Sequence, residues 1–277
     1  MNVETVDYRS EHAQEALTRS LHNTGFAVLS HHPITPERIA AFYEMWGNFF
    51  ASEEKHDWLR DPENQDGYFP FRSEHAKGQT VKDLKEFYHV YSWGRVPPAL
   101  EAETRALHND LTNLGVELLS WLQAMTPEEV KSQFTMPLNE MMAESVQSLL
   151  RILHYPPVEE DAEEGAIRAA AHEDINLITL LLAGSQPGLQ AKDSQGNWHD
   201  VSCDAGMITI NNGDMLARAS ANYFPSTTHR VVNPDAQANQ SRYSMPIFLH
   251  PRPDVMLDKD ISAGDYLQQR LREIGLK

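Results

Sequence analysis

Two residues near the middle of the chain, His172 and Asp174, have side chains that bind metal ions and lie two positions apart. If this segment is a strand, residues i and i+2 point to the same face, so the imidazole and the carboxylate can converge on one ion. Glu173 would then point the other way, which favours Asp174 as the carboxylate ligand. A His-x-Asp tripeptide also occurs on ordinary solvated strands, so this pair alone does not define a metal site.

A third candidate ligand, His229, lies further along the chain, just before an apolar run. Two imidazoles and one carboxylate form the facial triad of non-haem iron(II) centres, which leaves coordination positions open for a co-substrate and dioxygen. Metal binding requires neutral histidines and an ionised aspartate, the states expected at neutral pH. The sequence therefore predicts a metal site made of His172, Asp174 and His229.

Arg242 and Ser244 repeat the two-residue spacing in a later apolar run. On a strand they would share one face, with Tyr243 on the other. A guanidinium presents a planar fork of donors that fits a carboxylate, and a hydroxyl adds one more donor. Because a buried arginine is costly without an anionic partner, an internal strand here predicts an anionic ligand or a buried protein carboxylate. An exposed edge strand with a solvated Arg242 is the alternative.

The part of the chain that precedes residue 149 is expected to be mainly helical. Helices are expected over residues 12–22 and 36–50, after Pro97-Pro98, and around 138–148. The second of these has Thr35 as a candidate cap, Pro36 at its first position, and apolar residues three or four apart that form a core-facing stripe. Residues 25–34 are expected to form a strand. The polar segment 61–80 is expected to be a long loop, a lid or binding wall.

Short apolar or alternating runs begin near residue 149 and are separated by Gly, Pro, Asn and Asp. Several short strands at such spacing predict an all-β sandwich or barrel. Asn212-Gly213 predicts a tight turn between two of these runs. Without repeats or linkers, we expect one domain over residues 1–277. Its expected parts are a helix-rich region (1–148) packing on the core, most of the β-core with the metal site (149–255), and a C-terminal helix (256–277).

The net charge and the cysteine content narrow the classes of partner. Lys and Arg total 23 against 40 Asp and Glu, a net charge of −17. An acidic surface repels phosphate backbones, which disfavours nucleic acid, and also disfavours an anionic membrane. The single cysteine, Cys203, excludes an intramolecular disulfide. The N-terminal residues lack the apolar run of a signal peptide, and no stretch of about 18 apolar residues could span a bilayer. We therefore expect a cytoplasmic protein.

These motifs, in this order, resemble the isopenicillin N synthase-like branch of the iron(II)/2-oxoglutarate-dependent oxygenases. The family's H-x-D, distal His and R-x-S are matched by AHED, STTHR and SRYS. RILHYPP resembles the family's strand that ends in Tyr-Pro, and ITLLL, GLQAKDSQGNWHDV, ITINNGDML and HRVVNP fill the expected positions between the ligands. In the first half, GFAVLSHHPI and KEFYHV are also similar. The resemblance covers roughly residues 20–255.

The resemblance implies a double-stranded β-helix, or jelly roll, which is a mainly β fold with flanking helices. It implies that His172, Asp174 and His229 bind Fe(II), and that Arg242, Ser244 and Tyr155 hold the distal carboxylate of 2-oxoglutarate. The family position two residues before Tyr155 is often Asn and is Leu153 here. Dioxygen would be the other co-substrate, with ascorbate as an optional stimulant. The implied reaction hydroxylates a small metabolite with release of succinate and carbon dioxide; desaturation and ring closure are variants.

Two other functions stay open from the sequence. One is an iron oxidase of the same fold that does not use 2-oxoglutarate, in which Arg242 and Ser244 would hold a substrate carboxylate. The other is a metal- or ligand-binding jelly roll without redox chemistry. The primary substrate and the oligomeric state are not predicted. Candidate substrate contacts are Tyr68, Arg72, His75, Phe87, His89, Arg218 and Tyr223.

Overall fold

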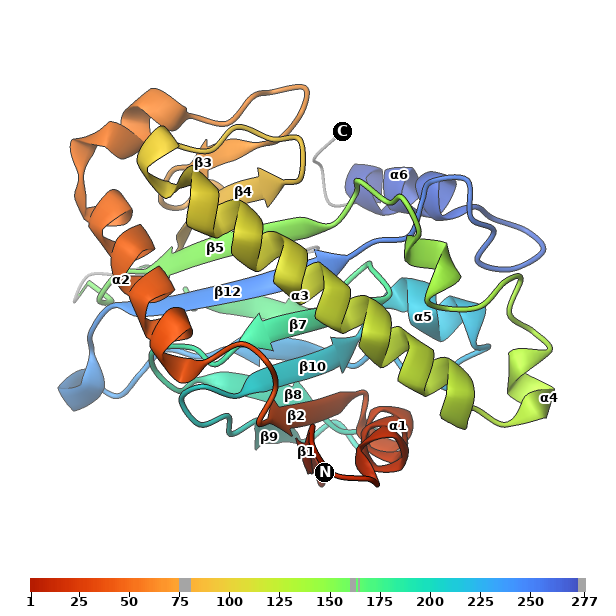
Figure 1. Cartoon of the computed structure of the whole chain (residues 1–277). Coiled ribbons are helices and arrows are strands. Elements are labelled where there is room, and N and C mark those ends of the chain that lie inside the picture. Colours follow the sequence, from red (N-terminus) through yellow and green to blue (C-terminus); the bar gives the residue numbers. More distant parts are fainter. Residues whose placement is uncertain (75–80, 160–162, 164, 274–277) are drawn as a thin grey trace.

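Two β-sheets form the centre of the computed structural model, which describes residues 1–74, 81–159, 163 and 165–273 (Figure 1). The large sheet has eight strands in the order β1-β2-β10-β7-β12-β5-β4-β3. The small sheet has four, in the order β6-β11-β8-β9. Neighbouring strands in the sheets are antiparallel except for β1 and β2.

The strands are short, and most are bounded by turns or loops. The large sheet contains β1 (Thr5–Asp7), β2 (Phe26–Ser30), β3 (Gly67–Phe69), β4 (Glu86–Tyr91), β5 (Leu149–Tyr155), β7 (Ile178–Leu182), β10 (Ile208–Asn212) and β12 (Arg242–Leu249). The small sheet contains β6 (Ala169–His172), β8 (Leu189–Lys192), β9 (Trp198–Asp200) and β11 (His229–Val231).

Helices cover the outer face of the large sheet, where α3 crosses the strands diagonally beside α2 (Figure 1). The α-helices are α1 (Ala13–Thr24), α2 (Pro36–Ala51), α3 (Pro98–Met125), α4 (Glu128–Lys131), α5 (Asp214–Ala219) and α6 (Ala263–Glu273); the 3-10 helices are η1 (Glu53–Trp58), η2 (Glu140–Met142) and η3 (Ala236–Ala238). As expected, Thr35 caps α2: its side chain accepts a hydrogen bond of 3.3 Å from the Arg38 N–H.

Two apolar clusters divide the core. The outer cluster joins α1, α2 and α3 to one face of the large sheet. The inner cluster lies between the two sheets and contains Phe26, Val28, Phe69, Phe87, Leu153, Tyr155, Ala169, Leu189, Ala191, Val201 and Val231. Burial of opposite strand faces in different clusters follows from the two-residue period of a strand. The predicted mainly β fold with flanking helices, a double-stranded β-helix, is confirmed.

Three local predictions were wrong. Around residues 138–148 the structure has only the three-residue η2 instead of a full helix. Segment 61–80 is not all loop, because it contains β3, while residues 75–80 lie outside the described residues. Asn212-Gly213 makes no hairpin turn: Asn212 ends β10 and Gly213 precedes α5 with φ of −107°, whereas a tight hairpin turn of that type needs positive φ.

The N-terminal region contributes strands as well as helices. Strands β1 to β4 all precede residue 149 and all belong to the large sheet. β2 pairs with β10, and β4 pairs with β5, so the first half of the chain extends the sheet at both edges. Among the residues that the structure describes, no helix is long and apolar enough to cross a membrane.

Candidate metal centre and carboxylate pocket

The side chains of His172, Asp174 and His229 meet at one point between the sheets. One ligand atom from each lies within 4.8 Å of the others. Oδ1 of Asp174 is 3.9 Å from Nε2 of His172 and 3.8 Å from Nε2 of His229. The side chain of His172 is 38 % exposed, against 5 % for Asp174 and 9 % for His229. The group is therefore buried on the Asp174 side and open to solvent on the His172 side.

Both imidazoles are held by backbone carbonyls. Nδ1 of His172 lies 2.7 Å from the carbonyl oxygen of Ala170, and Nδ1 of His229 lies 3.0 Å from that of Thr227. A carbonyl oxygen only accepts hydrogen bonds, so each Nδ1 carries the ring proton. The lone pair of each Nε2 is then free to bind a metal ion. This arrangement is the usual way in which a protein fixes the tautomer and orientation of a histidine ligand.

Only one oxygen of Asp174 is available to an ion. Its Oδ2 accepts hydrogen bonds of 2.6 Å from the Thr179 hydroxyl and 2.8 Å from the Asn211 amide. Thr179 on β7 and Asn211 on β10 are direct cross-strand partners, so the large sheet itself supplies both donors. Oδ1 is the oxygen that faces the two histidines.

Asp174 is not on a strand, contrary to the sequence prediction. β6 ends at His172, and Asp174 lies two residues beyond that end. The free N–H groups at the start of α5 hold the segment instead: those of Asp214 and Met215 donate to the carbonyls of Asp174 and Ile175, at 2.7 and 3.1 Å. Glu173 is directed away from the centre and accepts a hydrogen bond from the Thr228 hydroxyl.

The electrostatics of the centre suit a cation. Partial burial, followed by the nearby His229, lowers the pKa of His172, which favours the neutral ring that a metal ligand needs. Burial alone raises the pKa of Asp174, but the two histidines and the hydrogen bonds from Asn211 and Thr179 outweigh it, and the net pKa lies below the usual value. Two imidazoles and one carboxylate fit a hard or borderline divalent ion such as Fe(II).

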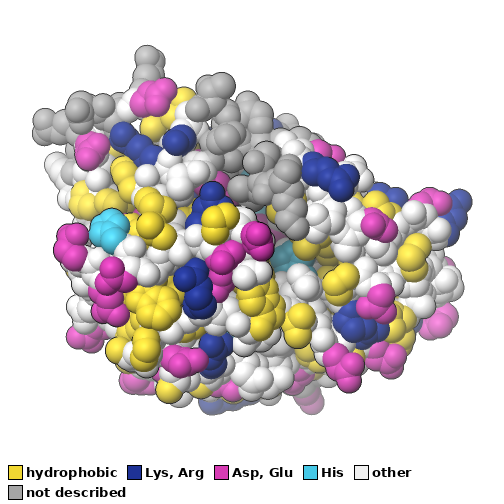
Figure 2. Space-filling model, turned by 90° about the horizontal axis from the view of Figure 1, so that it is seen from above, with side chains coloured by type: hydrophobic (Ala, Val, Ile, Leu, Met, Phe, Trp, Pro, Cys, Tyr) yellow, Lys and Arg dark blue, Asp and Glu magenta, His cyan; other side chains and the backbone are white. Residues whose placement is uncertain are grey.

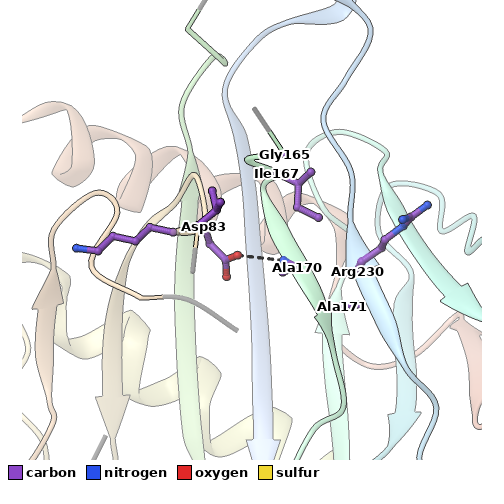
Figure 3. A pocket seen from close by; sticks show the side chains of 8 residues that line it. Asp83, Gly165, Ile167, Ala170, Ala171 and Arg230 are labelled. Atoms are coloured by element: carbon purple, nitrogen blue, oxygen red, sulfur yellow. Dashed lines mark hydrogen bonds between the residues drawn. The ribbon is translucent and has the colours of Figure 1, made fainter. Parts of the chain in front are cut away.

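A second layer of hydrogen bonds supports His172 at the open edge of β6. Asp83 accepts a hydrogen bond of 3.0 Å from the Ala170 N–H, the contact drawn in Figure 3, and forms an ion pair of 2.8 Å with Lys85. The Ala170 carbonyl in turn binds the His172 ring. A cavity of about 200 Å³ opens beside this contact, and its lining, which includes Ile167 and Arg230, contains none of the triad residues.

Arg242 and Ser244 share the inner face of the large sheet, and both are buried. Arg242 lies opposite Tyr155 of β5 and Ser244 opposite Leu153, and both of these partners belong to the inner apolar cluster. The Arg242 guanidinium lies 5.3 Å from the centre of the Tyr155 ring. Tyr243 points to the opposite face, where it stacks on His154. The internal strand excludes the solvated edge-strand alternative for Arg242.

The Arg242 guanidinium has unused donor capacity. Its Nε donates to the carbonyl of Gln186 at 2.9 Å, whereas the buried Nη1 has no hydrogen-bond partner. No carboxylate of the described residues forms an ion pair with Arg242. Gly184 leaves room for the group: a Cβ there would lie 2.7 Å from Nη2. A buried cation with an orphaned donor fits the distal carboxylate of a bound dicarboxylate.

Most of the other candidate substrate contacts lie away from the metal centre. Phe87 and His89 lie on β4, where Phe87 belongs to the inner cluster. Tyr68 belongs to the outer cluster and binds Glu86. Arg72 pairs with Glu159, Arg218 pairs with Asp258, and Tyr223 stacks on His22. His75 lies outside the described residues. Thr179, Asn211 and Asp83 were not predicted, because nothing in the local sequence marks a residue that hydrogen-bonds to a distant part of the chain.

Comparison with known proteins identifies the class. The family model of the 2OG-Fe(II) oxygenase superfamily matches residues 146–251. A second family model, described as the N-terminal region of the non-haem dioxygenase in morphine synthesis, matches residues 3–109. A solved structure from Caulobacter crescentus, described as a 2OG-Fe(II) oxygenase family protein, is 32 % identical, covers 98 % of this chain and 99 % of its own, and has a TM-score of 0.81.

Two further solved structures are similar. One from Shewanella oneidensis, described as an oxygenase, is 49 % identical over the whole of both chains, with a TM-score of 0.90. The other is a full-length Neurospora crassa protein in complex with alpha-KG (2-oxoglutarate) and 5-formyluracil; it is 25 % identical, the alignment covers 96 % of this chain and 94 % of that one, and the TM-score is 0.77.

The chain belongs to the 2-oxoglutarate/iron(II)-dependent oxygenase superfamily. Its cofactor is Fe(II), and its co-substrates are 2-oxoglutarate and dioxygen. The match to the N-terminal family model is consistent with the isopenicillin N synthase-like branch that the sequence resembles.

Proposed function

We propose that this oxygenase hydroxylates a small organic molecule at an iron(II) ion held by His172, Asp174 and His229. The main support for the proposal is the way in which the three side chains are hydrogen-bonded. Each presents one free ligand atom to the common point, while its other polar atom is already occupied by protein groups. Such preorganisation is expected of a metal site and is unexplained by packing alone.

We propose that Arg242, Ser244 and Tyr155 hold the distal carboxylate of 2-oxoglutarate. The unpartnered Nη1 of Arg242 supports this assignment, as does the burial of all three side chains. When bound together, Fe(II), 2-oxoglutarate and dioxygen supply the oxidation: 2-oxoglutarate takes one oxygen atom and becomes succinate and carbon dioxide, and a C–H bond of the substrate takes the other.

The chain's own residues orient the reactants and limit the access of water. The Ala170 and Thr227 carbonyls keep the proton of each ligand histidine on Nδ1. Thr179 and Asn211 keep one carboxylate oxygen of Asp174 turned toward the histidines. The inner cluster provides an apolar wall beside the site. An apolar wall that excludes water strengthens the electrostatic contacts within the site and protects reactive species from side reactions.

We propose that residues 1–277 act as one oxygenase unit, because strands from the first half of the chain complete the large sheet. The net charge of −17 supports a small-molecule substrate over nucleic acid or an anionic membrane. On the face in Figure 2, acidic and basic side chains are interspersed. A cytoplasmic location stays a prediction from the sequence.

The test is a substrate screen by succinate release. Fe(II)-loaded protein is incubated with 2-oxoglutarate, air and a panel of small molecules, and succinate and product are measured. We expect succinate and hydroxylated product in equal amounts, with both absent when 2-oxoglutarate is omitted. Oxygen consumption and substrate oxidation without succinate would instead establish the 2-oxoglutarate-independent oxidase. Tight metal binding without any oxygen consumption across the panel would favour the non-redox alternative.

A further inference from the structure

A second arginine, Arg168, is buried close to Arg242. It precedes β6 and is 1 % exposed, which makes it one of the largest fully buried side chains of the described residues. Its backbone N–H donates to Asn233 Oδ1 at 3.0 Å. Its guanidinium donates through Nη2 to the carbonyl of Gln240 at 2.6 Å. Gln240 is two residues before Arg242, so this contact holds the Arg168 head group at the start of β12.

The Arg168 head group has spare donor capacity and no protein counter-ion. Its buried Nε has no hydrogen-bond partner. No ion pair joins Arg168 to a carboxylate among the residues that the structure describes. An arginine stays charged in a protein, so burial without an anion is costly. A backbone carbonyl satisfies one N–H but does not neutralise the charge.

The two buried arginines act on each other. Burial, then the charge of Arg242, lowers the pKa of Arg168, while Tyr155 acts in the opposite direction. The contact with Gln240 puts Arg168 beside the start of β12, near Arg242 and Tyr155, two of the three members of the proposed co-substrate pocket. Two guanidinium groups, each with an unpartnered buried nitrogen, repel each other unless an anion lies between them. A carboxylate has two oxygens and about four acceptor sites, enough for both.

We infer that Arg168 is a second arginine of the co-substrate pocket and that, together with Arg242, it binds the distal carboxylate of 2-oxoglutarate. The inference rests on the proposed function, because it takes Arg242 as the first carboxylate ligand. It gives Arg168 a share in the preference of this pocket for an oxo acid that carries a second carboxylate. Arg168 lies in the segment that leads into β6 and His172, so this one segment would contribute to both ends of the bound co-substrate.

The test compares two ligands that differ only at the distal group. 2-Oxopentanoate has a methyl group where 2-oxoglutarate has its distal carboxylate, and both keep the oxo-acid end that chelates iron. Anaerobic calorimetry on the Fe(II)-loaded protein gives the affinity of each ligand and hence their ratio. In Arg168→Gln we expect the ratio to fall about 10- to 100-fold, the loss of a charge-assisted contact. The affinity for 2-oxopentanoate should change little.

Two further variants complete the test. Arg168→Lys keeps the positive charge but loses the planar guanidinium. Its affinity ratio should therefore lie between those of Arg168→Gln and the wild type. Arg230→Gln removes an arginine from β11 that binds Gln190 and stacks on Trp198, and should leave the ratio unchanged. An unchanged ratio in Arg168→Gln would overturn the inference. So would an equal loss for both ligands, which indicates a structural role through Gln240. A wild-type ratio near one would overturn the proposed function itself.

Discussion

Thr179 donates a hydrogen bond of 2.6 Å to Oδ2 of Asp174. It does so from β7, at a position directly opposite Asn211 of β10, which donates to the same oxygen. The carboxylate is therefore fixed by a cross-strand pair of the large sheet, although Asp174 itself lies beyond the end of a strand in the small sheet. Its free oxygen points to the two histidines because the other oxygen has no freedom to turn.

Replacing Thr179 by Val should weaken iron binding. The substitution keeps the shape of the side chain and removes only the hydroxyl, so Asp174 loses one of the two bonds on Oδ2. Groups that orient metal ligands in this way are worth about 10- to 100-fold in affinity. The measurement is the Fe(II) dissociation constant under anaerobic conditions. Thr179→Ser, which retains the hydroxyl, is the control. Equal affinity in Thr179→Val and the wild type would show that Asn211 alone orients Asp174.

Replacing Gly184 by Ala should weaken 2-oxoglutarate binding and leave iron binding unchanged. The added Cβ would lie 2.7 Å from Nη2 of Arg242, so the guanidinium must move. A displaced guanidinium would lose part of its charge-assisted hydrogen bonding to the carboxylate of 2-oxoglutarate. The complete contact is worth about 1.5–3 kcal/mol. The measurement is a pair of anaerobic titrations, one with Fe(II) and one with 2-oxoglutarate. A loss confined to iron affinity would contradict this account of Gly184.

Replacing Glu74 by Gln should destabilise the fold in a pH-dependent way. Glu74 forms ion pairs of 2.8 Å with Lys85 and 3.2 Å with Arg151. Burial raises the pKa of Glu74, but Arg151 and Lys85 outweigh it and hold the pKa well below the ordinary value of 4.5. The loss at neutral pH should reach about 3 kcal/mol, as for other broken buried pairs.

The sign of the pH effect follows from the lowered pKa of Glu74. Its contribution to stability is fully present above the unfolded-state pKa of about 4.5 and is lost as the pH falls toward the folded-state pKa. The difference in unfolding free energy between wild type and Glu74→Gln should therefore shrink below pH 4.5. Urea unfolding at several pH values measures it. A difference that stays constant across this range would show that the carboxylate charge is not involved.

Residue types and spacing, taken together with the family resemblance, predicted that the side chains of His172, Asp174 and His229 come together. His172, Asp174, His229, Arg242 and Ser244 all reach the space between the sheets. For Arg242 and Ser244 the reason is simple, because the two-residue period of β12 puts both on one buried face. For Asp174 the strand argument failed, and the convergence depends instead on N–H groups at the start of α5.

The residues that orient the ligands could not be predicted in the same way. Thr179 and Asn211 become neighbours only through the register of β7 with β10. Asp83 reaches Ala170 from a distant part of the chain. Asn212-Gly213 misled the prediction because its local preference for a turn is overridden by packing: a Cβ at Gly213 would lie 2.1 Å from the Asn176 carbonyl oxygen. Such contacts depend on tertiary structure rather than on local sequence.

The central claim, that iron and 2-oxoglutarate bind together at the triad, is tested most directly by anaerobic titration of the Fe(II)-loaded protein with 2-oxoglutarate. The visible metal-to-ligand charge-transfer band reports chelation of the oxo acid to the iron. We predict a saturable band in the wild type and none in His172→Ala. An iron-loaded wild type that develops no band, or a His172→Ala variant that develops the same band at the same ligand concentration, would contradict the assignment.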